Sequence, residues 1–212
     1  MRNILIIFSL LFISNISNAQ LVVPIDEVND YIDIYGILPK DKYFKDVNGI
    51  LDKYEGAWEG IHDNKTYYFE ITKLIEEPSR FNPLTLRDDL LIKFKIVDNS
   101  TNTTLYDTYN LSSDLLIKRS SFREITENKQ VMTYVGGDKG KVNCGDIGDI
   151  YLEPFALNTK LKVYVEPDSI VFYVEDGQPH PCPDGRILPP FPDNENDALI
   201  LTKLTSQPSL GN

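Results

Sequence analysis

The sequence is poor in the residues that most catalytic and metal sites require. Its 212 residues include two cysteines, two histidines and one tryptophan. The nucleophile pattern G-x-S-x-G, the zinc pattern H-E-x-x-H and an H-x-E pattern with a cysteine pair are all absent from the sequence. Neither histidine, the side chain best suited to take up a proton near neutral pH, lies beside an evident nucleophile. We therefore predict a non-enzymatic protein without a metal or a cofactor.

Basic residues are also scarce. There are 21 Lys and Arg against 32 Asp and Glu, which gives a formal net charge of −11. Binding to nucleic acid requires a clustered basic surface, so this composition argues against that class of partner. Hydrophobic residues make up 42% of the chain, which excludes global disorder, and aromatic residues are plentiful, with 12 Tyr and 10 Phe. The length suits one β-rich domain with short appendages.

Long hydrophobic runs are lacking after the first residues. Ile4–Ile13 is almost entirely apolar, follows Arg2, and precedes a polar stretch that ends in a small residue at Ala19. This layout is typical of a secretory signal peptide that is cleaved after Ala19. A membrane anchor is the alternative, but the apolar run is shorter than the roughly 20 residues that a spanning helix needs. The sequence therefore predicts a signal peptide at 1–19 and an exported, periplasmic or extracellular protein that is not membrane-anchored.

Export changes what is expected of the two cysteines. In an oxidising compartment, Cys144 and Cys182 are expected to form a disulfide bond. A pair of free thiols, one of them catalytic, is the alternative. A zinc site that includes His180 would lack the paired ligand spacing of a zinc finger.

The mature chain divides into an N-terminal extension at 20–55, a β-barrel domain at 56–205 and a flexible tail at 206–212. Residues 20–43 are acidic and irregular. Asp46 then caps a predicted helical turn whose apolar side chains share one face: Val47, Ile50, Leu51 and Tyr54. The turn is too short to be stable alone, so we expect this face to pack on the domain.

From Gly56 onward, apolar and polar residues alternate with the period of two that indicates β-strands. A tight turn at Asp63-Asn64 sets the register of the first hairpin, with His62 opposite Lys65 and Trp58 opposite Phe69. One face of this hairpin is then apolar: Trp58, Tyr67, Phe69 and Ile71. Further strands are predicted at 88–98, 103–109, 115–123, 130–135, 147–152 and 198–204.

Lys160–Glu175 is the clearest further hairpin in the sequence. A turn at Pro167-Asp168 would place Val163 opposite Phe172 and bring two apolar faces together. The total of eight to nine mostly antiparallel strands, without a long amphipathic helix, predicts an all-β protein. An open sheet of this size exposes two edges, so we expect a closed barrel or two stacked sheets.

The order of a short helical turn and then Gly56-Ala57-Trp58, at the head of a run of hairpins, resembles the opening of the lipocalin and fatty-acid-binding (calycin) barrels. The resemblance implies an eight- to nine-stranded antiparallel calycin-like barrel in which Trp58 closes one end. It also implies a basic residue over the tryptophan, which here would be Lys203, Arg119 or Arg123. The second lipocalin motif, Thr-Asp-Tyr, is missing. The segment 51–60 also resembles small exported Bacteroidota proteins of unknown function.

A barrel of eight strands is just wide enough either to pack solid or to hold one small ligand. The aromatic residues predicted to face inward are the candidate ligand-binding residues: Trp58, Tyr67, Phe69, Phe94 and Phe172. The same residues can instead fill the interior completely. The first interpretation predicts a non-enzymatic carrier of a small apolar or amphipathic molecule.

The second interpretation predicts an envelope interaction or inhibitor module with a filled interior. Its partner protein would be bound by the long loops at Glu76–Arg87, Gly136–Gly148 and Gly177–Asn196, where an exposed patch of Ile187, Leu188 and Phe191 is expected. Two other features are interpreted as structural. His62 is expected to be a solvated turn residue, and the acidic stretch 193–197 departs from a calcium loop at its glycine and glutamate positions.

Overall fold

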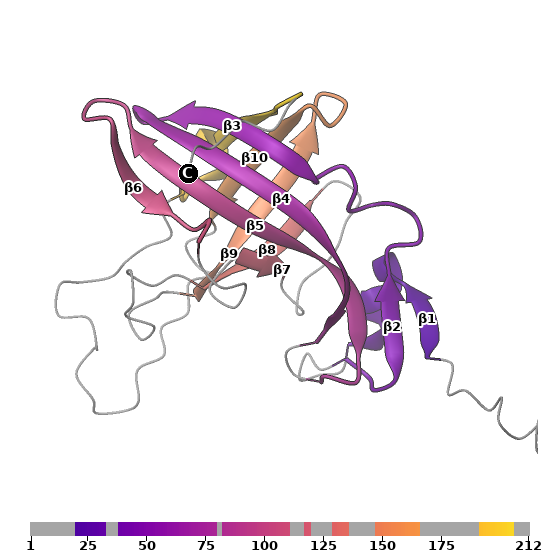
Figure 1. The fold of residues 1–212 in the computed structure, drawn as a ribbon. Helices are drawn as coiled ribbons and strands as arrows, with labels where there is room; N and C mark the ends of the chain where they lie inside the picture. Colours follow the sequence, from indigo (N-terminus) through magenta and orange to yellow (C-terminus); the bar gives the residue numbers. More distant parts are fainter. Residues whose placement is uncertain are drawn as a thin grey trace, which may run out of the picture.

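The computed structural model describes residues 20–32, 38–79, 82–110, 117–119, 129–135, 147–165 and 191–205. The all-β class is confirmed: within these residues, eleven strands form one sheet and the helical segments are short 3-10 turns (Figure 1). The strands are β1 Leu21–Pro24, β2 Lys42–Lys45, β3 Gly56–His62, β4 Lys65–Pro78, β5 Leu86–Asp98, β6 Thr103–Asp107, β7 Ile117–Arg119, β8 Gln130–Val135, β9 Ile147–Phe155, β10 Lys160–Val165 and β11 Leu199–Lys203. The 3-10 helices are η1 Ile25–Tyr31 and η4 Glu195–Asp197.

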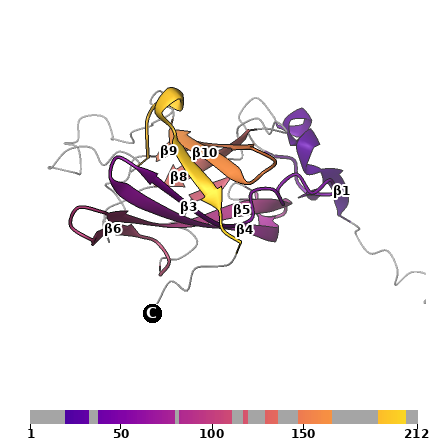
Figure 2. The ribbon, with the colours of Figure 1, turned by 90° about the horizontal axis from the view of Figure 1, so that it is seen from above.

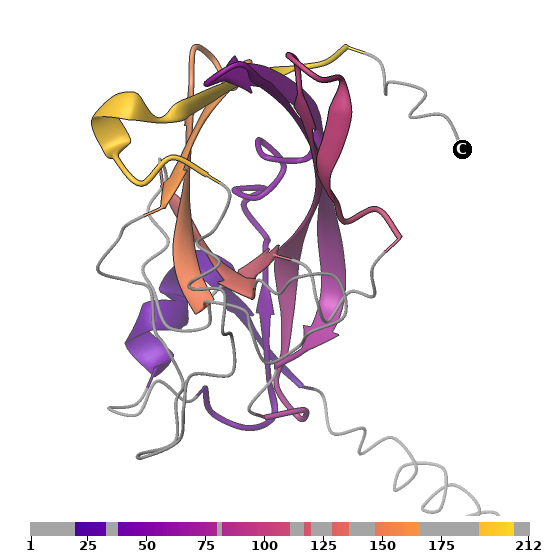
Figure 3. The same ribbon diagram turned by 90° about the vertical axis from the view of Figure 1, so that its left-hand side faces the viewer.

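The strands follow the order β1-β2-β5-β4-β3-β11-β10-β9-β8-β7, with β6 paired to one end of β5. β5 also pairs with β7, through Leu91 with Lys118 and Ile92 with Ile117. Neighbours are antiparallel except at β1–β2 and β2–β5. The sheet is strongly curved, so that β4 and β5 face β9 and β10 across an apolar core (Figure 3), and β11 lies beside β3 (Figure 2).

The first hairpin has the register that its turn predicts. His62 pairs with Lys65 and Trp58 with Phe69, and both turn residues, Asp63 and Asn64, have positive φ angles of 45° and 58°. Two such residues form the tight turn whose twist matches that of paired strands. The predicted inner face is buried as a whole, with Trp58, Tyr67, Phe69 and Ile71 no more than 3% exposed.

The strand predicted at 88–98 is confirmed as the main part of β5. Its alternate apolar residues all lie in the core: Leu90, Ile92, Phe94 and Ile96. The predicted partner at 103–109 is β6, and the predicted strands at 130–135 and 198–204 are β8 and β11. The strand expected within 115–123 is represented by β7. Period-two alternation was therefore sufficient to locate these strands.

The predicted pairing of Val163 with Phe172 is wrong. A strand has two lateral neighbours, and at Val163 these are Leu152 of β9 and Leu199 of β11. Instead, β10 forms a hairpin with β9, which is longer than expected and reaches Phe155. The turn Pro167-Asp168 and Phe172 lie outside the described residues.

The N-terminal extension is more ordered than its sequence suggests. β1, η1 and β2 lie beside the ends of β4 and β5 that extend past the rest of the sheet (Figure 1). Seven of its apolar side chains belong to the main core: Val23, Ile25, Val28, Leu38, Phe44, Leu51 and Tyr54. The expectation of an irregular segment over 20–43 is thus corrected, because these scattered apolar residues are brought to one side by tertiary packing.

Two other expectations need correction. The turn after Asp46 does bury Leu51 and Tyr54, but Val47 is 51% exposed and the segment forms successive turns. Glu76–Arg87 is not a long loop, since its two ends pair in β4 and β5 and Glu77 is opposite Arg87. Cys144 and Cys182 lie outside the described residues. Across the part of the chain that is described, no helix has the length and apolar character needed to span a membrane.

Candidate functional site

Trp58 lies near the start of β3, close to the turn that precedes this strand. Its side chain is fully buried, and its Nε1 donates a hydrogen bond to the carbonyl oxygen of Tyr54 at 2.8 Å. Lys203 Nζ lies 5.1 Å from the centre of the Trp58 ring, within the range of a cation–π interaction. Lys203, one of the three basic candidates, therefore lies over the tryptophan. The side chain of Arg119 and the whole of Arg123 lie outside the described parts.

Gly56 is required by this arrangement for two reasons. Its φ angle of +124° is strained for any residue with a Cβ atom. A Cβ placed there would also lie 3.1 Å from Cε of Lys203, whose aliphatic chain passes over the glycine. The side chain of Lys203 thus crosses Gly56 and ends above Trp58, which explains the spacing of these two residues.

The predicted ligand-binding residues Tyr67, Phe69 and Phe94 meet in one aromatic cluster inside the curved sheet. Phe191 joins this cluster, and its ring centre lies 5.6 Å from that of Phe69, 5.2 Å from that of Phe94 and 6.4 Å from that of Tyr67. The ring of Phe191 meets those of Phe69 and Phe94 edge to face, a geometry that aromatic pairs prefer. Phe172, the remaining predicted member, lies outside the described residues.

Phe191 was expected on an exposed loop patch, and this expectation is wrong. The side chain is buried, and the carbonyl of the next residue, Pro192, accepts a hydrogen bond of 2.8 Å from the backbone N–H of Val165. This bond holds the chain against β10 where Phe191 enters the interior. The proline-rich composition around Phe191 indicated a surface loop, and only the tertiary contacts reveal that its aromatic residue turns inward.

Gln130 at the start of β8 is a polar residue of the interior that the sequence did not single out. It is fully buried, and its side-chain Nε2 donates a 3.0 Å hydrogen bond to the carbonyl oxygen of Val131. Its Oε1 has no hydrogen-bond partner among the described residues. The sequence signal for this burial is parity: Gln130 and Met132 are two residues apart in the predicted strand 130–135, so both side chains lie on the same face.

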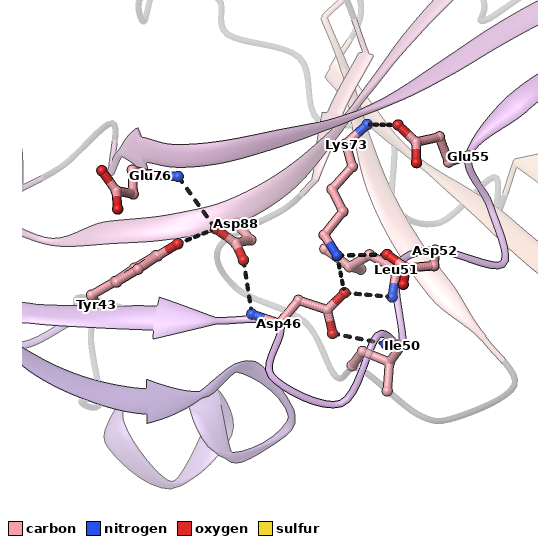
Figure 4. A network of polar contacts seen from close by, with 9 residues as sticks. All are labelled: Tyr43, Asp46, Ile50, Leu51, Asp52, Glu55, Lys73, Glu76 and Asp88. Atoms are coloured by element: carbon pink, nitrogen blue, oxygen red, sulfur yellow. Dashed lines mark hydrogen bonds and ion pairs between the residues drawn. The ribbon is translucent and has the colours of Figure 1, made fainter.

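A network of polar residues around the buried carboxylates of Asp46 and Asp88 lies between the N-terminal turn and the ends of β4 and β5 (Figure 4). Asp46 accepts hydrogen bonds from the N–H groups of Ile50 and Leu51, at 2.7 and 3.0 Å, and its Oδ2 lies 2.8 Å from Lys73 Nζ. Lys73 also binds Asp52, at 2.6 Å. Burial lowers the pKa of Lys73, but its hydrogen bonds to these two carboxylates outweigh that effect and raise it.

The same group continues to Asp88. This buried carboxylate accepts hydrogen bonds from the Tyr43 hydroxyl at 2.6 Å and from the N–H groups of Asp46 and Glu76. Burial and the bond to Asp88 raise the pKa of Tyr43. Both carboxylates thus have several donors around them, which suits a structural clamp between the turn and the sheet.

On the outer face of the sheet, the rings of Tyr151 and Tyr164 are stacked 5.1 Å apart, and Lys129 Nζ lies 4.4 Å from the centre of the Tyr151 ring. Glu153 accepts a hydrogen bond from the Tyr164 hydroxyl and lies 3.2 Å from Lys129 Nζ. Burial raises the pKa of Glu153, but these hydrogen bonds and the charges of Lys129 and Lys162 outweigh it, so that the pKa is lowered.

The remaining sequence candidates are the two histidines and the acidic stretch 193–197. His62 is partly buried, with its Nε2 3.6 Å from a carboxylate oxygen of Asp63 and 3.8 Å from one of Asp197. The acidic stretch 193–197 contains η4, which is capped by the side chain of Asn194. No group of three or more His, Cys, Asp or Glu residues that could hold a metal ion occurs within the described segments. His180 lies outside them.

No family model, curated protein or solved structure matches this chain.

Proposed function

We propose that this chain is an exported, non-enzymatic protein that binds a small apolar or amphipathic molecule inside a calycin-like barrel. The barrel would consist of β3, β4, β5 and β7–β11. Support for closure comes from β5, which pairs with β4 on one edge and with β7 at Leu91 and Ile92 on the other. The lysine over Trp58 supports the calycin type, because the resemblance implies a basic residue at that place.

The single observation that carries the binding function is the position of Phe191. Its ring lies among Tyr67, Phe69 and Phe94, yet it comes from a segment outside the strands that supply those three residues. Tyr67, Phe69 and Phe94 therefore form an aromatic surface on the strands. The side chain of Phe191, which comes from another segment, covers this surface. A ligand of similar size and apolar character can take the same contacts if Phe191 leaves.

Replacing Phe191 with alanine tests this function. The F191A variant should bind the uncharged fluorescent probe N-phenyl-1-naphthylamine at least about tenfold more tightly than the wild type, since the probe no longer competes with a side chain worth roughly 1.5–3 kcal/mol of burial. Phe155→Ala is the matched control, because Phe155 is 42% exposed at the end of β9. Equal binding by the two variants would contradict the proposal, as would the absence of binding by any form.

Native mass spectrometry of protein purified from its own host completes the test. A co-purified small molecule supports the carrier function directly. The same spectra test the two proposals about processing, because export predicts a chain that begins at Gln20 and a disulfide predicts that Cys144 and Cys182 have lost two hydrogens.

The second candidate function is an interaction or inhibitor module with a filled interior. Phe191 also favours this function, since the chain's own side chain already fills the aromatic cluster. On the outside, Ile61 of β3 and Ile200 of β11 are 68% and 39% exposed on neighbouring strands. A folded F191A variant without affinity for the probe, together with loss of partner capture on Ile61→Ser, would favour this function over the first.

A further inference from the structure

Gln130 points into the interior of the sheet. Side chains alternate between the two faces of a strand, and the next residue of the same parity in β8 is Met132, which belongs to the main core. The residue of β9 that pairs with Gln130 is Leu152, which is also a core residue. Val131, in contrast, belongs to the small cluster on the opposite face of the sheet. Gln130 thus places an amide group among apolar side chains, without any exposure to solvent.

The orientation of this amide is fixed by its hydrogen bond to the backbone of Val131. The atom that lies 3.0 Å from the carbonyl oxygen of Val131 must be the NH₂ group, because two oxygens would repel each other. The other atom of the amide is therefore Oε1, an acceptor, and it is the atom without a hydrogen-bond partner in the described structure. An unsatisfied buried acceptor is unfavourable and is rare in folded proteins.

Bound water explains this acceptor less well than a ligand does. A buried water molecule typically makes about three hydrogen bonds to protein groups. The described inward neighbours of Gln130 are instead apolar, namely Met132 on its own strand and Leu152 opposite it, with Val163 beyond. A water molecule there would exchange several hydrogen bonds in bulk solvent for one, whereas an amphipathic molecule brings its own apolar surface.

We propose that Oε1 of Gln130 accepts a hydrogen bond from the head group of the bound ligand, and that this head group is a neutral donor such as a hydroxyl. This inference rests on the proposed binding function and specifies the chemistry of its ligand. A carboxylate offers acceptors only, so it would face the acceptor Oε1 without a hydrogen bond and would place an unpaired charge in a site of low polarity. The ligand class is therefore an apolar molecule with a neutral donor in its head group, such as an alcohol, and not a fatty acid anion.

Three probes of equal chain length separate these classes: decanol, decanoate and decane, each measured by displacement of N-phenyl-1-naphthylamine from the full chain in neutral buffer. Decanol should displace the probe at about a tenfold lower concentration than decanoate, which corresponds to one hydrogen bond gained or lost. In the Gln130→Leu variant this preference should disappear, while the affinity for decane stays within about twofold because leucine has a similar size.

The stability of Gln130→Leu provides an independent readout, followed by urea unfolding without ligand. Removal of an acceptor that has no partner should leave the midpoint unchanged or raise it, and Gln130→Met repeats the comparison with an unbranched side chain. A lowered midpoint in both variants would show that the amide has a structural partner, such as water, and would overturn the inference. Equal affinity for decanol and decanoate would also overturn it and leave the carrier function intact, whereas failure of all three probes with wild type and F191A would refute the carrier function itself.

Discussion

Replacing Asp46 with asparagine should destabilise the protein far more than the same change at Asp52, although both carboxylates bind Lys73. The side chain of Asp46 is fully buried, whereas that of Asp52 is 62% exposed. Asp46 also accepts the N–H groups of Ile50 and Leu51, so it holds the turn as well as the lysine. The two variants remove one negative charge each from the same cation, and they differ in burial and in the hydrogen bonds of Asp46 to the turn.

Loss of one partner from a buried ion pair costs about 3–5 kcal/mol. Asparagine keeps one acceptor oxygen for the turn, so about 3 kcal/mol is expected for Asp46→Asn. Asp52→Asn should cost less than about 1 kcal/mol, as exposed pairs do. With a urea dependence of about 2 kcal/mol per molar, Asp46→Asn should lower the unfolding midpoint by about 1.5 M and Asp52→Asn by less than about 0.5 M.

Fluorescence of Trp58, the only tryptophan and a fully buried one, is the natural signal for this measurement. Double-mutant cycles with Lys73→Met then isolate the pairwise terms, and the coupling of Lys73 with Asp46 should exceed its coupling with Asp52. Equal midpoints for the two asparagine variants would refute the reasoning, because burial would then not decide the strength of the pair.

Three further predictions concern the sheet. Gly60→Ala should lower the free energy of unfolding in urea by about 1–3 kcal/mol, because a Cβ would overlap the backbone carbonyl of Ile200 on β11. An unchanged midpoint would mean that β3 and β11 can separate freely at this point. Trp58→Phe should lower the free energy of unfolding by about 1–2 kcal/mol, with unfolding followed by circular dichroism, since the hydrogen bond from Trp58 Nε1 to the carbonyl of Tyr54 is lost. An unchanged free energy would show that this carbonyl has another donor. The pKa of Glu153 is lower in the folded state, so the stability that its carboxylate contributes should be complete above pH 4.5, its ordinary pKa, and be lost as the pH falls through the folded pKa. The urea midpoints of wild type and Glu153→Gln should therefore differ at neutral pH and converge in strong acid. A difference that stays constant with pH would contradict this prediction.

Local sequence was sufficient where a turn and a strand pattern agreed. Asp63 and Asn64 adopt the positive φ angles of a tight turn, and this turn alone sets the register in which Trp58 is opposite Phe69. The hairpin of β9 and β10 was missed for the corresponding reason. Its turn contains Ala156, Leu157 and Asn158 at positive φ, and only the asparagine among them is a typical turn residue, so the turn signal is weak.

The interior required information about distant segments. Phe191 and Gln130 have ordinary local surroundings in the sequence, one in a proline-rich stretch and the other at the start of a short strand. Their burial depends on β10 and β9, to which Pro192 and Gln130 are joined by backbone pairing. No pattern within a few residues of either one records these partners.

The sequence by itself determined the all-β class, the strands that alternate around Trp58 and Phe94, and the glycine before the tryptophan, because each of these follows from local backbone geometry and the period of two. Only the tertiary structure decided that Lys203 lies over Trp58, that Phe191 fills the aromatic cluster and that Gln130 brings into the core an acceptor without a partner among the described residues. Which side chains meet in the interior depends on how far the sheet curves and on which strands become neighbours, and these properties belong to the whole chain.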